Sequence, residues 1–223
     1  MKFRDFQITF QPTPEDDRND MRMASLGVFA MFEPLRLWIR AQKIDAPFVK
    51  LLIQLERSTL PSGSTWCAGH ANGICFVGVS VDFSRLGVDC STVEWMAKMV
   101  QASLAAVRHK IGWGCLALDA HVAELTAKPW PLDHHFAPYD RIDRKTGVTV
   151  ATWAEFEPGR TELVVKQSRQ EKFLREDIVK TAEGQLYMED DFPISRAAIR
   201  SGRYDLLTKT GEVLVSIPLE VGR

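Results

Sequence analysis

Residues 74–83 read ICFVGVSVDF. β-Branched and aromatic residues dominate this run, and Val79, Val81 and Phe83 alternate with polar residues near its end, which predicts a β-strand. In residues 91–109 apolar side chains recur at three- and four-residue steps, starting with a Ser-Thr-Val-Glu capping box, which predicts a helix. A strand and a helix in close succession indicate a fold that contains both kinds of element.

The preceding and following segments add further elements of both kinds. Residues 3–10 alternate apolar and polar side chains, as in a half-buried strand. A helix is expected over residues 20–43, with a kink or restart at Pro34, because proline removes a backbone donor. Residues 48–56 fit a buried strand or a two-turn helix equally well, and the apolar run 111–118 predicts a core strand.

The C-terminal part of the chain also mixes strands and helix. Residues 148–156 predict a strand, and residues 161–182, rich in charges of both signs at i,i+4 spacing, predict a solvated helix. A short strand is expected at 186–188, and a closing hairpin from 204–208 to 213–217. These elements predict an α+β fold: a mixed or mainly antiparallel sheet with about three packed helices and a C-terminal β-hairpin.

The chain has 223 residues, which fits one large domain or one domain with a small appendage. Residues 126–147 contain several prolines and a run of histidine, aspartate and arginine, and we interpret them as a connector or a functional loop. They separate an N-terminal α+β subdomain, residues 1–125, from a C-terminal one, residues 148–223. We expect the two subdomains to pack as one globule.

The charge balance argues against nucleic acid as a partner, because 28 Lys and Arg residues face 29 Asp and Glu residues, a net charge of −1. Residues 1–10 alternate in polarity and lack the apolar core of a secretory signal. The uncharged run 58–81 holds polar residues that are costly in a bilayer. We therefore expect a soluble cytoplasmic protein without membrane contact, whose four cysteines are free thiols.

Cys67, His70 and Cys75 form a Cys-x2-His-x4-Cys pattern in a glycine-rich loop. Thiolate and imidazole are ligands that zinc accepts, so these three residues are the candidate metal ligands. A fourth ligand is missing nearby, and structural zinc sites usually draw their ligands as two close pairs. We therefore expect no metal, with Cys75 buried as a small apolar residue and His70 solvated.

Cys90 is the candidate catalytic nucleophile, because a thiol at a helix N-terminus is favoured in its thiolate form. The string Asp89-Cys90-Ser91 resembles the nucleophile motif of NlpC-type cell-wall cysteine peptidases, and His121, followed by valine, resembles the start of their histidine strand. The resemblance implies a cysteine-dependent hydrolase with Cys90 and His121 as the reacting pair. The chain carries Thr92 where those enzymes carry glycine.

The proline-rich segment offers a candidate surface for protein contact. Aromatic side chains with polar tips serve interfaces well, and several lie close together there. Neighbouring histidines on an extended chain point to opposite sides, so we do not expect the His-His pair to bind one ion. The predicted interface residues are Trp130, His134, His135, Phe136 and Tyr139.

The motifs of nucleotide cofactors and of hydrolytic metal sites do not occur, so we expect no cofactor. The leading hypothesis is a soluble, non-catalytic interaction protein, for example a bacterial toxin-neutralising (immunity-like) or adaptor protein that acts on a protein partner. One alternative is a cysteine-dependent hydrolase or transferase that uses Cys90 and a histidine. Another is a small-molecule-binding module, suggested by the six tryptophans.

Overall fold

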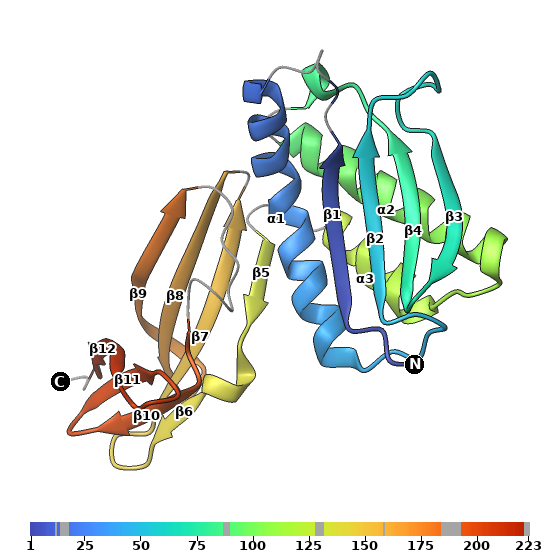
Figure 1. The fold of residues 1–223 in the computed structure, drawn as a ribbon. Helices are drawn as coiled ribbons and strands as arrows, with labels where there is room; N and C mark the ends of the chain where they lie inside the picture. The colour runs from blue at the N-terminus through green and yellow to red at the C-terminus, as the bar shows by residue number, and fades with distance from the viewer. Residues whose placement is uncertain are drawn as a thin grey trace. The chain divides into compact units, whose positions relative to one another are not determined.

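The computed structural model divides into two compact units (Figure 1). We call Met1–Leu132 with Glu157–Gly159 the N-terminal unit, and Asp133–Phe156 with Arg160–Arg223 the C-terminal unit. The structure describes residues 1–11, 13, 18–86, 90–127, 132–157, 159–183 and 193–220. Within these ranges the side chains of Met21, Met23, Cys90, Ser91, Val93 and Glu183 are not described.

The N-terminal unit contains a four-stranded mixed sheet in the order β1-β2-β4-β3. β1 (Asp5–Gln11), β2 (Lys50–Glu56) and β4 (Ile74–Ser80) run parallel to one another. β3 (Thr65–Ala71) is the edge strand and pairs antiparallel with β4. The alternating burial of β2 settles the ambiguous segment 48–56 as a strand.

Three helices contact one another and cover one face of this sheet: α1 (Arg18–Gln42), α2 (Cys90–Ile111) and α3 (Leu116–Ala127) (Figure 1). α1 continues through Pro34, so the expected restart there is wrong. The core between helices and sheet includes side chains of β2 and β4 that are almost completely inaccessible: Leu51, Ile53, Leu55, Cys75, Val77 and Val79. Burying a side chain of leucine or valine size contributes about 1.5–3 kcal/mol, so this layer dominates the stability of the unit.

The C-terminal unit is built from strands. Its larger sheet has the order β5-β7-β8-β9, with β6 pairing with β7. The bounds are β5 (Leu132–His135), β6 (Arg141–Asp143), β7 (Val148–Glu157), β8 (Arg160–Arg169) and β9 (Lys172–Glu183). A short 3-10 helix, η2 (Ala137–Tyr139), lies between β5 and β6.

A second, antiparallel sheet completes the C-terminal unit with β10 (Arg196–Arg200), β11 (Arg203–Leu207) and β12 (Val213–Pro218). Tyr204 on β11 is fully buried, and its hydroxyl lies 2.7 Å from Thr152 Oγ1 on β7. The same hydroxyl donates to the carbonyl of Tyr139 at 2.9 Å. This side chain therefore ties the two sheets of the unit together.

The predicted α+β class is confirmed, with three helices and sheets that are mixed or antiparallel. The helices expected over 20–43 and 91–109 are present as α1 and α2, and the closing hairpin is present as β11 and β12. The strand expected at 186–188 lies outside the described residues. Among the described residues, no helix combines the length and the apolar character needed to span a membrane.

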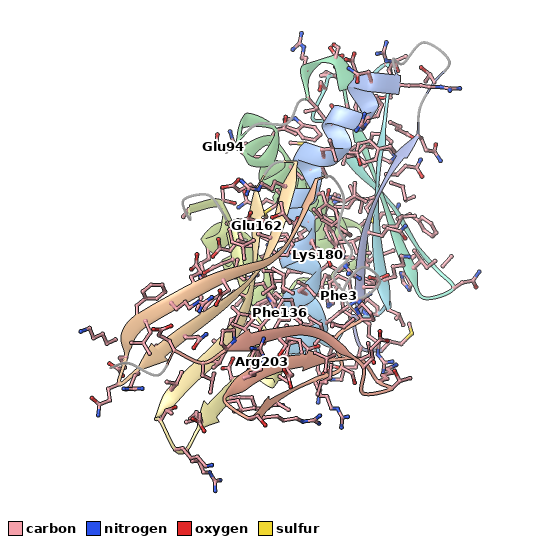
Figure 2. All side chains as sticks on the ribbon, turned by 90° about the vertical axis from the view of Figure 1, so that its left-hand side faces the viewer. Phe3, Glu94, Phe136, Glu162, Lys180 and Arg203 are labelled. Carbon is pink, nitrogen blue, oxygen red and sulfur yellow. The ribbon has the colours of Figure 1, made fainter. Side chains whose placement is uncertain are left out.

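The helix predicted over 161–182 is wrong, because this segment is the antiparallel pair β8 and β9. Figure 2 shows Glu162 and Lys180 on these two strands. Burial along β8 has a period of two, and the turn at Gln170 and Glu171 takes positive φ values of 49° and 64°. Lys166 pairs with Glu155 and Glu176 across the strands, so its ionic partners are not i,i+4 neighbours.

The strand predicted over 111–118 is also wrong. α2 runs to Ile111, and α3 begins at Leu116. Gly112 ends α2 with φ +70°, a left-handed conformation that glycine adopts readily, and its N–H donates to Arg108 O at 3.0 Å. The segment 126–147, expected to be a connector or loop, contains β5, η2 and β6 in its described part. The boundary between the two units falls inside it, after Leu132.

Candidate functional site

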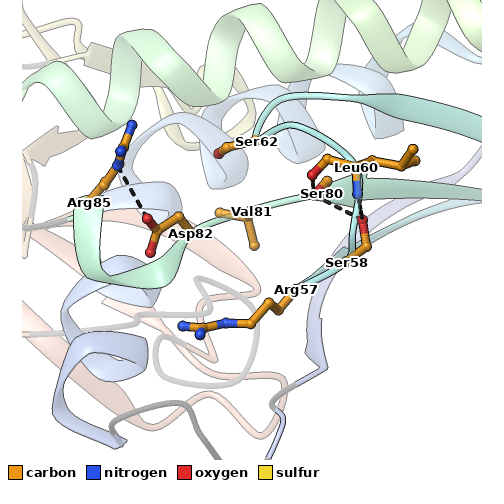
Figure 3. Close-up of a pocket in the computed structure, with 8 residues that line it drawn as sticks. All are labelled: Arg57, Ser58, Leu60, Ser62, Ser80, Val81, Asp82 and Arg85. Atoms are coloured by element: carbon orange, nitrogen blue, oxygen red, sulfur yellow. Dashed lines mark hydrogen bonds and ion pairs between the residues drawn. The ribbon is translucent and has the colours of Figure 1, made fainter.

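A cavity of about 390 Å³ opens at the carboxyl ends of β2 and β4 in the N-terminal unit (Figure 3). Parallel strands end at the same edge of a sheet, so the chain that leaves each of them meets there. The cavity is lined by Arg57, Ser58, Leu60, Ser62, Ser80, Val81, Asp82 and Arg85. Six of these eight side chains are charged or carry a hydroxyl, which makes the wall strongly polar.

A second cavity of about 350 Å³ adjoins the first and shares Ser62, Asp82 and Arg85 with it. Its other lining residues are Leu86, Thr92 and Trp95. Thr92 and Trp95 belong to the start of α2, where the positive end of the helix dipole is found. We call the two adjoining cavities together the arginine cavity.

Hydroxyl groups hold the loop that follows β2 against the end of β4. Ser58 Oγ donates to Ser80 Oγ at 3.0 Å, and Ser80 Oγ donates to the carbonyl of Leu60 at 2.9 Å (Figure 3). The N–H of Leu60 donates back to Ser58 Oγ at 3.2 Å. Gly63, with φ +93°, turns the chain so that its N–H reaches Ser80 O at 2.7 Å. This ring of bonds preorganises the wall of the cavity.

Asp82 is the acidic group of the cavity. Ser84 donates to its Oδ1 through its hydroxyl at 2.7 Å and its N–H at 3.3 Å, and Arg85 Nε lies 3.2 Å from its Oδ2. The Ser84 bonds, and then the charges of Arg85 and Arg57, lower the pKa of Asp82, so it is ionised at neutral pH. Among the lining residues that the structure describes, two carry a guanidinium group and one a carboxylate.

This arrangement suits the binding of an anion. Guanidinium groups present a planar fork of donors that matches a carboxylate or a phosphate, and the hydroxyl of Ser62 is a further donor in the lining. The lining residues include no cysteine and no histidine. The described part of the wall therefore offers charged and hydrogen-bonding groups.

The structure brings two of the three candidate metal ligands together. Cys67 Sγ on β3 lies 3.9 Å from Cys75 Sγ on β4. His70 is exposed on the edge strand. Among the residues that the structure describes, no group of three or more His, Cys, Asp or Glu side chains is arranged to hold a metal ion.

The proposed pair of Cys90 and His121 is not tested, because the Cys90 side chain is among those not described. Cys90 is the first residue of α2. The ring of His121 stacks on Trp38 of α1 with a centroid distance of 4.3 Å and an interplanar angle of 10°. Its Nδ1 lies 3.5 Å from Glu124 Oε2. His121 therefore has a packing partner and an acidic neighbour within the N-terminal unit.

Four of the five predicted interface residues lie in the C-terminal unit and make ring contacts in two groups, while Trp130 lies outside the described residues. His134 contacts Phe136 edge-to-face, and Phe136 lies against Tyr139. His135 stacks on Trp153 at 4.4 Å, and its Nε2 lies 2.8 Å from Asp140 Oδ1. We call these side chains the aromatic cluster: His134, His135, Phe136, Tyr139 and Trp153. All of them are half-buried, so they are also structural parts of the unit.

Sequence reasoning missed the arginine cavity, although its residues stand next to recognisable signals. Ser58 and Leu60 follow the apolar run 48–56, and Asp82 ends the strongest strand pattern. Had that run been assigned as a strand parallel to 74–83, the common edge of the two strands would have located the site. The missing information was the pairing of two segments that are distant in sequence.

Comparison of the chain with models of known families, with curated proteins and with solved structures finds no match.

Proposed function

We propose that this chain is a non-catalytic binding protein whose N-terminal unit holds a small anionic molecule in the arginine cavity. The observation that carries the proposal is that Arg57 and Arg85 both line one cavity at the carboxyl ends of parallel strands. Open sheets with parallel strands bind ligands at this edge. The proposal corresponds to the small-molecule-binding alternative of the sequence analysis.

The size and chemistry of the cavity support a small, hydrophilic ligand. Its two parts, about 390 and 350 Å³, fall within the range of roughly 300–1,000 Å³ in which proteins bind small molecules. An uncharged apolar ligand is disfavoured, because burying its surface against a polar wall would contribute little favourable free energy. A carboxylate or phosphate would pair with the guanidinium groups, and the α2 N-terminus would add a favourable dipole.

Calorimetric titration with inorganic phosphate and with citrate, at constant ionic strength, tests this proposal. We expect saturable binding of at least one of these anions, and a loss of about tenfold or more in affinity for Arg57→Gln and for Arg85→Gln, equivalent to ~1.4 kcal/mol. The matched control is Arg4→Gln, which removes an exposed arginine of the same unit and should bind like the wild type. Absence of saturable binding, or an equal loss in the control, would contradict the proposal.

A second candidate function is the interaction-protein hypothesis, with an immunity-like or adaptor role. It is favoured by Phe173 and Ile178 on β9, whose side chains are 61% and 55% exposed. Their partners on β8 are Ser168 and Val164, which places both on the same face of the sheet. β9 is the last strand in the order β5-β7-β8-β9, and exposed apolar side chains on such a strand suit contact with a protein partner.

Cross-linking mass spectrometry in the native host separates the two functions. A protein partner that cross-links to the wild type should be lost from the double variant Phe173→Ser/Ile178→Ser. The control Val213→Ser changes an exposed valine of another strand in the same unit and should keep the partner. Equal cross-linking of all three proteins would exclude β9 as the contact.

A further inference from the structure

Two thiols lie close together between the edge strand and its neighbour in the N-terminal unit. Cys67 Sγ is 3.9 Å from Cys75 Sγ. In the register of β3 and β4, Cys67 is opposite Val77 and His70 is opposite Cys75. A bulge between Cys67 and Gly69 separates these two pairs. The two sulfurs are therefore diagonal neighbours, and their separation exceeds a disulfide bond by only about 2 Å.

The environments of the two thiols differ. Cys67 is half-buried on the edge strand, and its sulfur accepts a hydrogen bond from the N–H of Gly69 at 3.4 Å, which fixes its direction toward Cys75. Cys75 is fully buried in the layer between sheet and helices. Burial, and then the neighbouring Cys67, raise the pKa of Cys75 to about 12, so it stays a neutral thiol. A small oxidant therefore reaches Cys67 first.

We propose that Cys67 and Cys75 form an oxidisable dithiol, which hydrogen peroxide converts into a disulfide between β3 and β4. The proposal is independent of anion binding in the arginine cavity. Its basis is the short distance between two sulfur atoms on paired strands, where Cys67 is partly accessible to solvent and Cys75 is buried. The bond would tie the edge strand to the centre of the sheet.

The reaction balances in two steps. Cys67 loses its proton, its thiolate attacks one oxygen of hydrogen peroxide, and the O–O bond breaks, which oxidises Cys67 to the sulfenic acid. The departing hydroxide combines with the released proton to form the first water. The Cys75 sulfur then attacks the Cys67 sulfur, the S–O bond breaks, and the departing hydroxide takes the Cys75 proton as water. In total two thiols are oxidised, one peroxide is reduced, and two water molecules form.

Peptide mapping of the full chain tests the proposal directly. No lysine or arginine stands between Arg57 and Arg85, so trypsin releases both cysteines in one peptide, residues 58–85. After peroxide treatment and alkylation, we expect this peptide to carry no alkyl group and to be two hydrogen atoms lighter than the reduced form. In the untreated protein, unfolded before alkylation, both cysteines should be alkylated.

Variants identify the order of the steps. Cys67→Ser should leave Cys75 reduced under the same treatment, and Cys75→Ala should leave Cys67 as a sulfenic acid that dimedone traps. Cys115→Ser, which removes another half-buried thiol, is the matched control and should form the disulfide like the wild type. Circular dichroism checks that each variant is folded, and the wild-type map does not depend on any variant.

Three results would overturn the proposal. One is a peptide 58–85 with two alkylated cysteines although methionine oxidation elsewhere proves that the peroxide was active. Another is oxidation of Cys67 to the sulfinic acid while Cys75 remains alkylated. The third is a disulfide that joins either residue to Cys90 or Cys115 instead.

Discussion

The arginine cavity and the aromatic cluster both contain polar side chains but differ in what surrounds them. In the aromatic cluster two polar side chains have protein partners: His135 Nε2 lies 2.8 Å from Asp140 Oδ1, and the Tyr139 hydroxyl donates to Ile194 O at 2.9 Å. In the arginine cavity the charged groups line open volume. We therefore expect the cluster to contribute mainly to the stability of its unit, whereas our proposal of ligand binding concerns the cavity.

The difference changes the meaning of the sequence-predicted interface. Histidine and aromatic residues in a proline-rich segment predict a contact surface, but here they also pack within the C-terminal unit. Trp153, for example, is covered by His135 on one side and has Lys166 Nζ 5.4 Å from its ring centroid. Changes in the C-terminal unit should therefore reduce stability, and changes in the cavity should reduce binding.

The largest effect is expected for Tyr204→Ala. This side chain is fully buried and joins the two sheets of the C-terminal unit. Its removal leaves a cavity and takes away the hydrogen-bond partner of the Thr152 hydroxyl. We expect a loss of about 3–5 kcal/mol in the free energy of unfolding, measured by urea denaturation. A loss below about 1 kcal/mol would show that the unit does not depend on this connection.

For Tyr204→Phe we expect a smaller change in the free energy of unfolding, and one that depends on pH. Burial raises the pKa of Tyr204 to about 12 in the folded chain, above the usual value of 10.0. The unfolded chain therefore releases this proton at lower pH than the folded chain does. Stability contributed by Tyr204 is fully present below pH 10 and is lost as the pH rises toward 12.

Urea denaturation of the wild type and of Tyr204→Phe across this range measures that contribution. The wild type should lose stability more steeply than the variant between pH 10 and pH 12, since phenylalanine has no proton to release. Tyr139→Phe, which removes a half-buried hydroxyl, is the control. Parallel curves for the wild type and Tyr204→Phe would show that the hydroxyl is not held in its neutral form.

The smallest effect on stability is expected in the arginine cavity. Arg85 is 79% exposed, and a surface ion pair such as that with Asp82 contributes little. Arg57→Gln and Arg85→Gln should each change the free energy of unfolding by no more than about 0.5 kcal/mol, in the same denaturation assay. A large destabilisation would mean that the two arginines support the fold, and the contrast with the aromatic cluster would disappear.

The spacing of apolar residues predicted an element correctly where one face of that element is buried in a continuous layer. Met96, Val100 and Val107 of α2 repeat at helical spacing and are all buried, so the helix could be predicted. Thr161, Leu163 and Val165 of β8 are buried with equal regularity, at a spacing of two. The charges between them resembled helix pairs, because Glu162 and Lys166 are four residues apart whichever element they occupy.

The amino-acid sequence by itself determined the α+β class, the two long helices, the strongest strand and the closing hairpin, because residue spacing and turn residues within a few positions indicate them. Only the tertiary structure showed three other features: the parallel pairing of β2 with β4, the strands β8 and β9 in place of the predicted helix, and the short distance between Cys67 and Cys75. Each of these depends on hydrogen bonds between separate strands, whose register no local pattern specifies. The arginine cavity belongs to the same group, since it exists only where the ends of two such strands meet.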